Sequence, residues 1–128
     1  MEFNGKVLIV DDEPHIRKYL GLILRKAGKP AIIEASNGEE ALQFYETHAP
    51  DLVLMDVNMP VLDGMQALER LLARHPDACV VMLTSLATRS IVERCVELGA
   101  ANFIRKDTPK DMIASVLAAT LEELFASD

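Results

Sequence analysis

Five short apolar runs, each followed by a segment with a helical pattern, constrain the fold of this chain most. Four of them cover residues 7–10, 31–33, 52–55 and 80–83, and the fifth, residues 101–104, is interrupted by Asn102. Runs of this length that are bounded by turn signals are typical of strands buried on both faces of a sheet. Strands that alternate with helices form parallel sheets with right-handed crossovers and helices on both faces. The pattern therefore predicts an α/β fold, a doubly wound five-stranded parallel sheet.

Short polar residues and prolines mark where the helices begin. Asp12 is placed to cap the first helix, and Pro14 lies in its first turn. Ser36 begins a sequence with capping-box spacing, so the second helix is expected to start after it. Thr108 and Pro109 are expected to take the cap and first position of the last helix.

The composition fits one globular domain that works apart from nucleic acids and membranes. Half of the 128 residues are hydrophobic, and the net charge is −7. Nucleic-acid binding requires a basic patch, which this charge argues against. No apolar run approaches the ~20 residues of a membrane span. Residues 1–3 begin neither the basic segment nor the apolar core of a signal peptide, so we expect a soluble cytoplasmic protein.

Polar residues that follow four of the apolar runs are expected to meet at one edge of the sheet. They are Asp11, Asp12, Asp56, Thr84 and Lys106. The carboxyl ends of parallel strands share an edge, and ligands bind in the crevice outside it. Asp56 directly follows four apolar residues, and a buried strand does not tolerate an unpaired charge. Asp56 is therefore expected where the central strand emerges into solvent.

The residue types at this edge favour phosphoryl chemistry with a metal ion. Three clustered carboxylates repel one another and gain proton affinity unless a cation lies among them. Mg²⁺ fits such a site, because it binds through one or two carboxylates and accepts phosphate oxygens. A carboxylate beside the metal can attack a phosphoryl group, whose oxygens Thr84 and Lys106 can stabilise. Taken singly, the same residues also suit a helix cap, a turn, a strand hydroxyl and a surface lysine.

The chain resembles the bacterial response-regulator receiver domains over nearly its whole length. The matching motifs are Val10-Asp11-Asp12-Glu13, the nine residues 56–64, Thr84-Ser85 and Lys106. The resemblance implies a flavodoxin-like (βα)5 fold with strand order 2-1-3-4-5. It also implies a single receiver domain over residues 1–128, of the chemotaxis-regulator type, with no output domain in this chain. Such a receiver either acts alone through partners or is one part of a longer regulator.

The same resemblance assigns a role to most of the clustered residues. Asp56 is expected to accept a phosphoryl group from a histidine kinase or a small phosphodonor. Asp11 or Asp12, together with Asp56 and the backbone carbonyl of Asn58, is expected to hold Mg²⁺. Thr84 and Lys106 are expected to contact the phosphoryl group.

The resemblance further implies a conformational switch. Phe103 matches the switch aromatic of the family, although a phenylalanine at the edge of the core is an alternative interpretation. Phosphorylation would change the surface of the fourth helix, fifth strand and fifth helix. The implied partners are a sensor histidine kinase or phosphotransfer protein and an output protein of unknown identity. A phosphorylation-dependent homodimer is left open. Catalysis would be limited to self-phosphorylation and slow self-dephosphorylation.

Two positions depart from the family pattern. Many receivers have a proline with a cis peptide directly after the lysine, whereas Asp107 follows Lys106 here. A cis bond before a residue other than proline costs about 2.5–4 kcal/mol, so we predict a trans peptide. The Lys-Asp-Thr-Pro sequence is similar to receivers that precede helix-turn-helix output domains. Ser85 takes a place where alanine is common, and the pattern does not predict its effect.

Two other functions remain as alternatives. A phosphohydrolase with an aspartyl nucleophile needs a second aspartate two residues after the first for acid–base work, and Asn58 occupies that position. A flavin-binding electron carrier of similar fold needs a loop rich in hydroxyl groups and glycine after the first strand. The acidic sequence 11–13 would repel a phosphate there.

Overall fold

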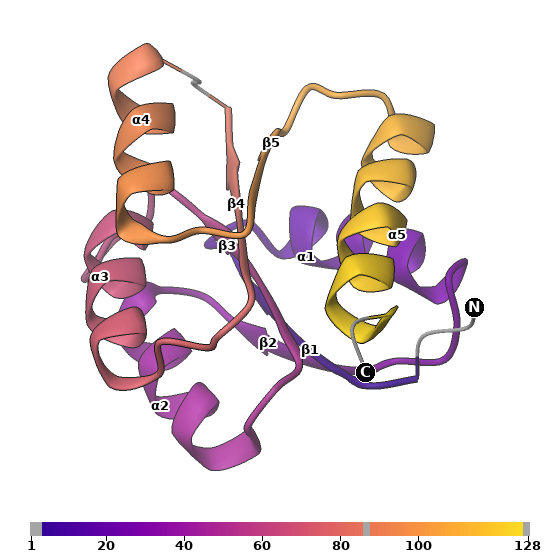
Figure 1. Ribbon diagram of the computed structural model, residues 1–128, viewed down its shortest axis with the longest axis horizontal. Helices are drawn as coiled ribbons and strands as arrows, with labels where there is room; N and C mark the ends of the chain where they lie inside the picture. The colour runs from indigo at the N-terminus through magenta and orange to yellow at the C-terminus, as the bar shows by residue number, and fades with distance from the viewer. Residues whose placement is uncertain (1–3, 86–87, 127–128) are drawn as a thin grey trace.

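A parallel sheet lies between two layers of helices in the computed structural model, which describes residues 4–85 and 88–126 (Figure 1). The strands are β1 (Lys6–Val10), β2 (Ala31–Ala35), β3 (Leu52–Asp56), β4 (Val80–Thr84) and β5 (Asn102–Arg105). The helices are α1 (Pro14–Arg25), α2 (Gly38–His48), α3 (Gly64–Arg74), α4 (Arg89–Leu98) and α5 (Lys110–Ala126). Residues 1–3, at which the sequence predicts no signal peptide, lie outside the described residues.

The sheet is wholly parallel, and its strand order is β2-β1-β3-β4-β5. This order confirms the flavodoxin-like α/β fold that the resemblance implied. The inner strands β1, β3 and β4 are buried along almost their whole length, as their unbroken apolar runs predicted, whereas β2 and β5 form the partly exposed edges. All five strands point the same way, so the ends of β1, β3 and β4 meet at one edge.

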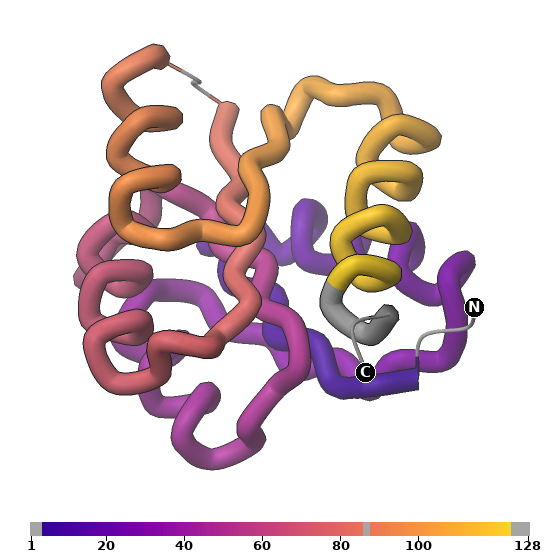
Figure 2. Tube along the Cα trace, viewed as in Figure 1, coloured from indigo at the N-terminus to yellow at the C-terminus, as the bar shows by residue number. Residues whose placement is uncertain are grey.

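Each face of the sheet has its own apolar core. Successive side chains of a strand point to opposite faces, so Leu52 and Leu54 pack with residues of α1 and α5, whereas Val53 and Met55 pack with residues of α2, α3 and α4. Figure 2 shows α5 returning beside α1 on one side of the sheet, and the two helices are in contact. Burying an aliphatic side chain stabilises a fold by about 1.5–3 kcal/mol. These two cores therefore hold the strand ends in place.

The capping prediction for the first helix was wrong, and the difference shapes the acidic edge. Glu13 takes the N-cap position of α1, and Pro14 follows as the first helical residue. The backbone N–H of Glu13 donates instead to Asp11 Oδ1 at 2.9 Å. The Asp12 side chain therefore does not cap α1, and Asp12 is exposed beside the end of β1.

Two other helices begin one residue later than the sequence predicted. Asn37 caps α2 by accepting from the backbone N–H of Glu40 at 2.8 Å, and Ser36 donates to the Glu40 side chain instead. Helix α5 begins at Lys110, and the carbonyl of Pro109 accepts from the N–H groups of the first turn. Short polar clusters indicate that a helix begins nearby more reliably than they indicate the first residue.

The backbone around the strand ends contains the predicted trans peptide and one close approach. No peptide bond in residues 4–85 and 88–126 is cis, so the trans Lys106–Asp107 bond is confirmed. A Cβ atom on Gly64 would overlap the carbonyl oxygen of Asp56, and the Gly64 N–H donates to Val57 at 2.8 Å. Glycine at this position therefore lets α3 begin directly against the end of β3. Across the described ranges, no helix is long and apolar enough to cross a membrane.

Candidate functional site

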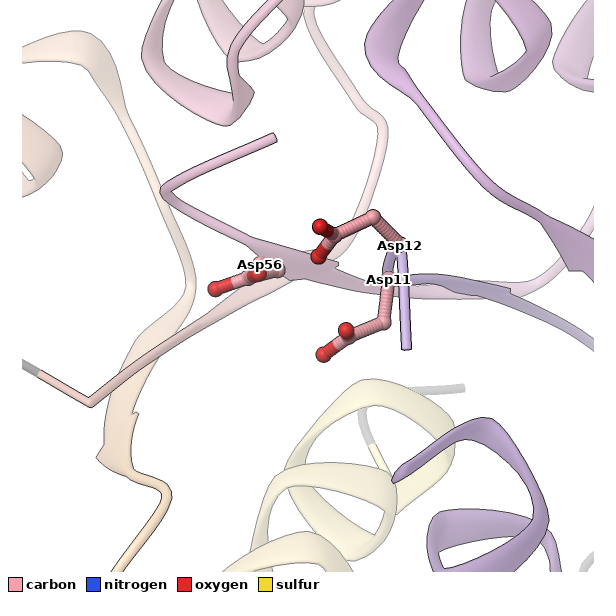
Figure 3. Close-up of side chains that lie close together, drawn as sticks. All are labelled: Asp11, Asp12 and Asp56. Carbon is pink, nitrogen blue, oxygen red and sulfur yellow. The ribbon is translucent and has the colours of Figure 1, made fainter. Parts of the chain in front are cut away.

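Three carboxylates converge at the carboxyl edge of the sheet. Asp11 and Asp12 follow β1, and Asp56 is the last residue of β3 (Figure 3). One oxygen from each of the three side chains lies within 4.8 Å of the others. Asp11 and Asp56 are buried, whereas Asp12 is exposed. The expectation that Asp56 emerges into solvent was wrong, because Lys106 lies against its carboxylate and the next residue, Val57, is buried too. The structure thus brings together the three acidic residues that the sequence placed at this edge.

The Lys106 ammonium lies among these carboxylates. Its Nζ atom is 2.7 Å from Asp11 Oδ2, 3.1 Å from Asp56 Oδ2 and 3.7 Å from Glu13 Oε1. The backbone N–H of Lys106 donates to the carbonyl of Thr84 at 2.8 Å, which ties the lysine to the end of β4. Burial alone lowers the pKa of Lys106, but hydrogen bonding to Asp11 and the charge of Asp56 outweigh it and raise the pKa overall. The ammonium therefore stays protonated at neutral pH.

Asp56 has the proton affinity expected of a crowded, buried carboxylate. Burial and the neighbouring charge of Asp11 raise its pKa to about 6, while Lys106 and a backbone hydrogen bond from Asn58 oppose the shift. At pH 7.5 the ionised form still predominates. A cation placed between the carboxylates would favour ionisation further, because it cancels the repulsion from Asp11.

The donor set fits Mg²⁺. Three carboxylates and one ammonium at this edge leave an excess of negative charge when all are ionised. Asp11 Oδ2 is buried, and the Lys106 ammonium lies 2.7 Å from it. Carboxylate oxygens are hard ligands, and Mg²⁺ typically binds through one or two of them while keeping several waters. The acidic cluster is therefore consistent with a Mg²⁺ site.

The remaining predicted residues lie around this cluster. Thr84 is buried at the end of β4, where it pairs with Arg105 of the neighbouring strand β5. Asn58 is exposed in the loop after β3. Phe103 is half-buried in β5, where it pairs with Met82 and packs against the core on the α3 and α4 side. Phe103 therefore lies below the polar edge, not in it.

Sequence reasoning missed two residues that contact the cluster. Glu13 donates its backbone N–H to Asp11 and brings a further carboxylate near Lys106. Arg17 donates from a guanidinium nitrogen to the backbone carbonyl of Asp11 at 2.6 Å. A charged residue on the first turns of a helix looks like an ordinary solvated position, because nothing in the apolar pattern shows which way its side chain turns. The only sign of these contacts in the sequence was that Glu13 and Arg17 lie close to the acidic pair.

Comparisons with known proteins agree with this geometry. The family model of the response regulator receiver domain matches residues 7–118. The chemotaxis protein CheY of Bacillus subtilis is 35% identical over 116 residues, which cover 91% of this chain and 97% of that protein. A crystal structure of the CheX–CheY–BeF3–Mg²⁺ complex from Borrelia burgdorferi matches with a TM-score of 0.83 and 34% identity, over 94% of this chain and 88% of that chain.

A CheY-like receiver domain protein from Methanospirillum hungatei matches with a TM-score of 0.88, over 98% of this chain and all of that chain. Its identity of 24% limits that likeness to the fold.

The raised pKa of Asp56 predicts how an asparagine at this position changes stability. The folded-state pKa of about 6 exceeds the unfolded value of about 3.9, so the native state binds more protons between these values. The free energy of unfolding of the parent therefore falls as pH rises through this range. Asp56→Asn removes this loss, so its stability relative to the parent should rise by about 2 kcal/mol between pH 4 and pH 7.5 without metal.

Urea unfolding of both proteins in EDTA at these two pH values measures the difference. Asp77→Asn, at an exposed carboxylate, serves as the control and should show little change. A stability difference for Asp56→Asn that stays constant with pH would refute the raised pKa. Adding Mg²⁺ at pH 7.5 should stabilise the parent and narrow its difference from Asp56→Asn.

Proposed function

This chain belongs to the response regulator receiver family of two-component signalling, and on that premise we propose that phosphorylation of Asp56 switches its surface between two states. One observation carries the proposal. Asp56 ends the central strand with its carboxylate between two other carboxylates and the Lys106 ammonium. This arrangement offers an anionic nucleophile, ligands for a divalent cation and a fixed positive charge at one place.

The three carboxylates and the backbone carbonyl of Asn58 would hold Mg²⁺. When bound, the ion supplies positive charge that offsets the repulsion between the carboxylates and the incoming phosphoryl group. The buried Asp11 is held by the backbone N–H of Glu13, whereas Asp12 reaches the cluster from the exposed side. The fit of this donor set and the BeF3–Mg²⁺ complex of the Borrelia relative support the metal assignment.

In the phosphoryl transfer, the ionised form of Asp56 is the nucleophile. A carboxylate oxygen of Asp56 forms a bond to phosphorus, and the bond between phosphorus and the donor's imidazole nitrogen breaks. The electron pair of that bond returns to the imidazole, which leaves as a neutral ring because its other nitrogen carries a proton. Lys106 lies 3.1 Å from Asp56 Oδ2, so its ammonium can balance charge on the transferred group without a large movement. The donor is a phosphohistidine of a kinase or phosphotransfer protein, or a small phosphodonor.

Phosphorylation would act on the fold through Thr84 and Lys106. An aspartyl phosphate adds about two negative charges and new acceptor oxygens beside these side chains. A hydrogen bond to a charged group contributes about 1.5–3 kcal/mol, and inverting a population from 1:99 to 99:1 requires about 5.5 kcal/mol. Two such contacts approach that value, whereas either one alone falls short. Both residues are therefore needed for a complete switch.

The change would reach partners through α4, β5 and α5. Movement of Thr84 toward the phosphoryl group would alter the space beside β5, and the half-buried Phe103 would then turn further inward. The outer surface around Phe103 then differs between the two states. The chain would receive its phosphoryl group from a sensor kinase or phosphotransfer protein and pass the signal to an output protein. The CheX complex of the Borrelia relative supports partner binding of this kind.

Labelling with acetyl phosphate and Mg²⁺ tests the acceptor. Intact-mass measurement should show one added phosphoryl group on the parent and none on Asp56→Asn, because among residues 4–85 and 88–126 Asp56 is the one carboxylate of the cluster that ends a strand. Asp63→Asn, at the cap of α3, is the control and should label like the parent. Full labelling of Asp56→Asn would refute the assignment. Sustained turnover of phosphate esters by the parent would support the phosphohydrolase alternative instead.

Thr84→Ala tests the switch separately from the acceptor. The variant should still accept the phosphoryl group on Asp56, but it should lose much of the conformational change, because one of the two stabilising contacts is gone. Amide chemical shifts recorded with and without beryllofluoride measure the change from Ile91 to Leu117. Thr47→Ala, which removes an exposed hydroxyl on α2, is the control and should respond like the parent. Equal shift changes in Thr84→Ala and the parent would exclude this route.

A further inference from the structure

Arg17 joins the acidic edge to the neighbouring strand through two hydrogen bonds. Its Nε atom donates to Glu34 Oε1 at 2.8 Å, and its Nη1 atom donates to the backbone carbonyl of Asp11 at 2.6 Å. The Arg17 side chain is only 16% exposed. The planar guanidinium makes both contacts at once, because it presents several donors in a fixed fork. Arg17 thus holds α1, the end of β1 and β2 together beside the carboxylates.

The contact with Asp11 fixes a particular peptide group. The N–H of Asp11 donates to the carbonyl of Ala35 at 3.0 Å, and Asp11 Oδ1 accepts from the N–H of Glu13. The carbonyl of Asp11 belongs to the peptide that leads to Asp12, and Arg17 is the side chain that holds it. The orientation of this peptide decides where the Asp12 side chain leaves the backbone.

Asp12 depends on that backbone placement. Within the described ranges, its carboxylate has no hydrogen bond or ion pair, although one of its oxygens lies within 4.8 Å of those of Asp11 and Asp56. Its position relative to the other two carboxylates is therefore set by the turn between β1 and α1. Residues that orient metal ligands in this way commonly change metal affinity by 10–100-fold when they are replaced.

We infer that Arg17, anchored by Glu34, is a positioning residue that holds the Asp11–Asp12 peptide in the orientation required for Mg²⁺ binding. This inference rests on the proposed metal role of the cluster. The anchor has a second consequence: Glu34 draws the guanidinium toward β2 and away from the carboxylates, where it would compete with a metal ion. Arg17 thereby organises an anionic site without neutralising its side chains.

The sign of the effect separates positioning from simple electrostatics. Removing a positive charge near a cation site should strengthen cation binding if charge alone matters. Removing the contact that orients Asp12 should weaken binding. Arg17→Met loses both the positive charge and the hydrogen bond to Asp11. Lys18→Met loses only a positive charge, because Lys18 is exposed and has no hydrogen bond or ion pair within the described residues. The two variants therefore form a matched pair.

The experiment is a titration of each folded protein with MgCl₂, followed by amide chemical shifts. Arg17→Met should bind Mg²⁺ about tenfold more weakly than the parent, whereas Lys18→Met should bind with an unchanged or slightly lower Kd. Arg17→Lys should fall between Arg17→Met and the parent, because one ammonium cannot reproduce the fork. Before metal is added, the Asp12 amide should shift in Arg17→Met and not in Lys18→Met.

Labelling by acetyl phosphate provides the second measurement. Arg17→Met should need a higher Mg²⁺ concentration for half-maximal labelling but reach the parent's rate at saturation. Equal or tighter Mg²⁺ binding by Arg17→Met than by the parent would overturn the positioning role. If Arg17→Met does not fold, equal or tighter Mg²⁺ binding by Arg17→Lys would overturn that role instead. A parent that binds no Mg²⁺ would contradict the proposed metal role itself. If the parent binds Mg²⁺ and Arg17→Met binds it with the same affinity, only the role of Arg17 is contradicted.

Discussion

The contact of Lys106 with Asp11 and Asp56 is the interaction on which the rest of the site depends. Three carboxylates confined within 4.8 Å repel one another, and one ammonium offsets only part of that repulsion. Burial makes the balance more sensitive, because charges away from water are screened less. The site therefore remains anionic and responds strongly to added charge. A divalent cation would relieve the repulsion, and a phosphoryl group would add to it.

The fold can hold this unfavourable cluster because its stability comes from elsewhere. Two apolar cores, one on each face of the sheet, fix the ends of β1, β3 and β4 independently of the charges. Backbone hydrogen bonds then connect these ends: Val57 donates to Leu83, and Lys106 donates to Thr84. Under the proposed function, a change of charge at Asp56 would reach β4 and β5 through these short, direct contacts. The arrangement suits a switch, since the site can change while the cores stay packed.

The sequence predicted the elements that depend on apolar pattern and missed those that depend on side-chain direction. Unbroken runs such as 52–55 identified the buried strands, because inner strands must be apolar on both faces. The strand order came from the resemblance, since the pattern alone does not say which strands are neighbours. The cap at Asp12 was wrong because Glu13 took that position and Asp11 accepted its N–H. Arg17 was missed because its two partners, Asp11 and Glu34, meet only in the folded chain.

The central claim is that Asp56 is the residue on which phosphoryl chemistry and metal binding converge. A crystal structure of the protein with beryllofluoride and Mg²⁺ tests this most directly. The account predicts beryllium bonded to an Asp56 carboxylate oxygen, Mg²⁺ among the oxygens of Asp11, Asp12 and Asp56, and the Lys106 ammonium against a fluoride. Beryllofluoride bound to another carboxylate, or Mg²⁺ bound away from these three residues, would contradict it.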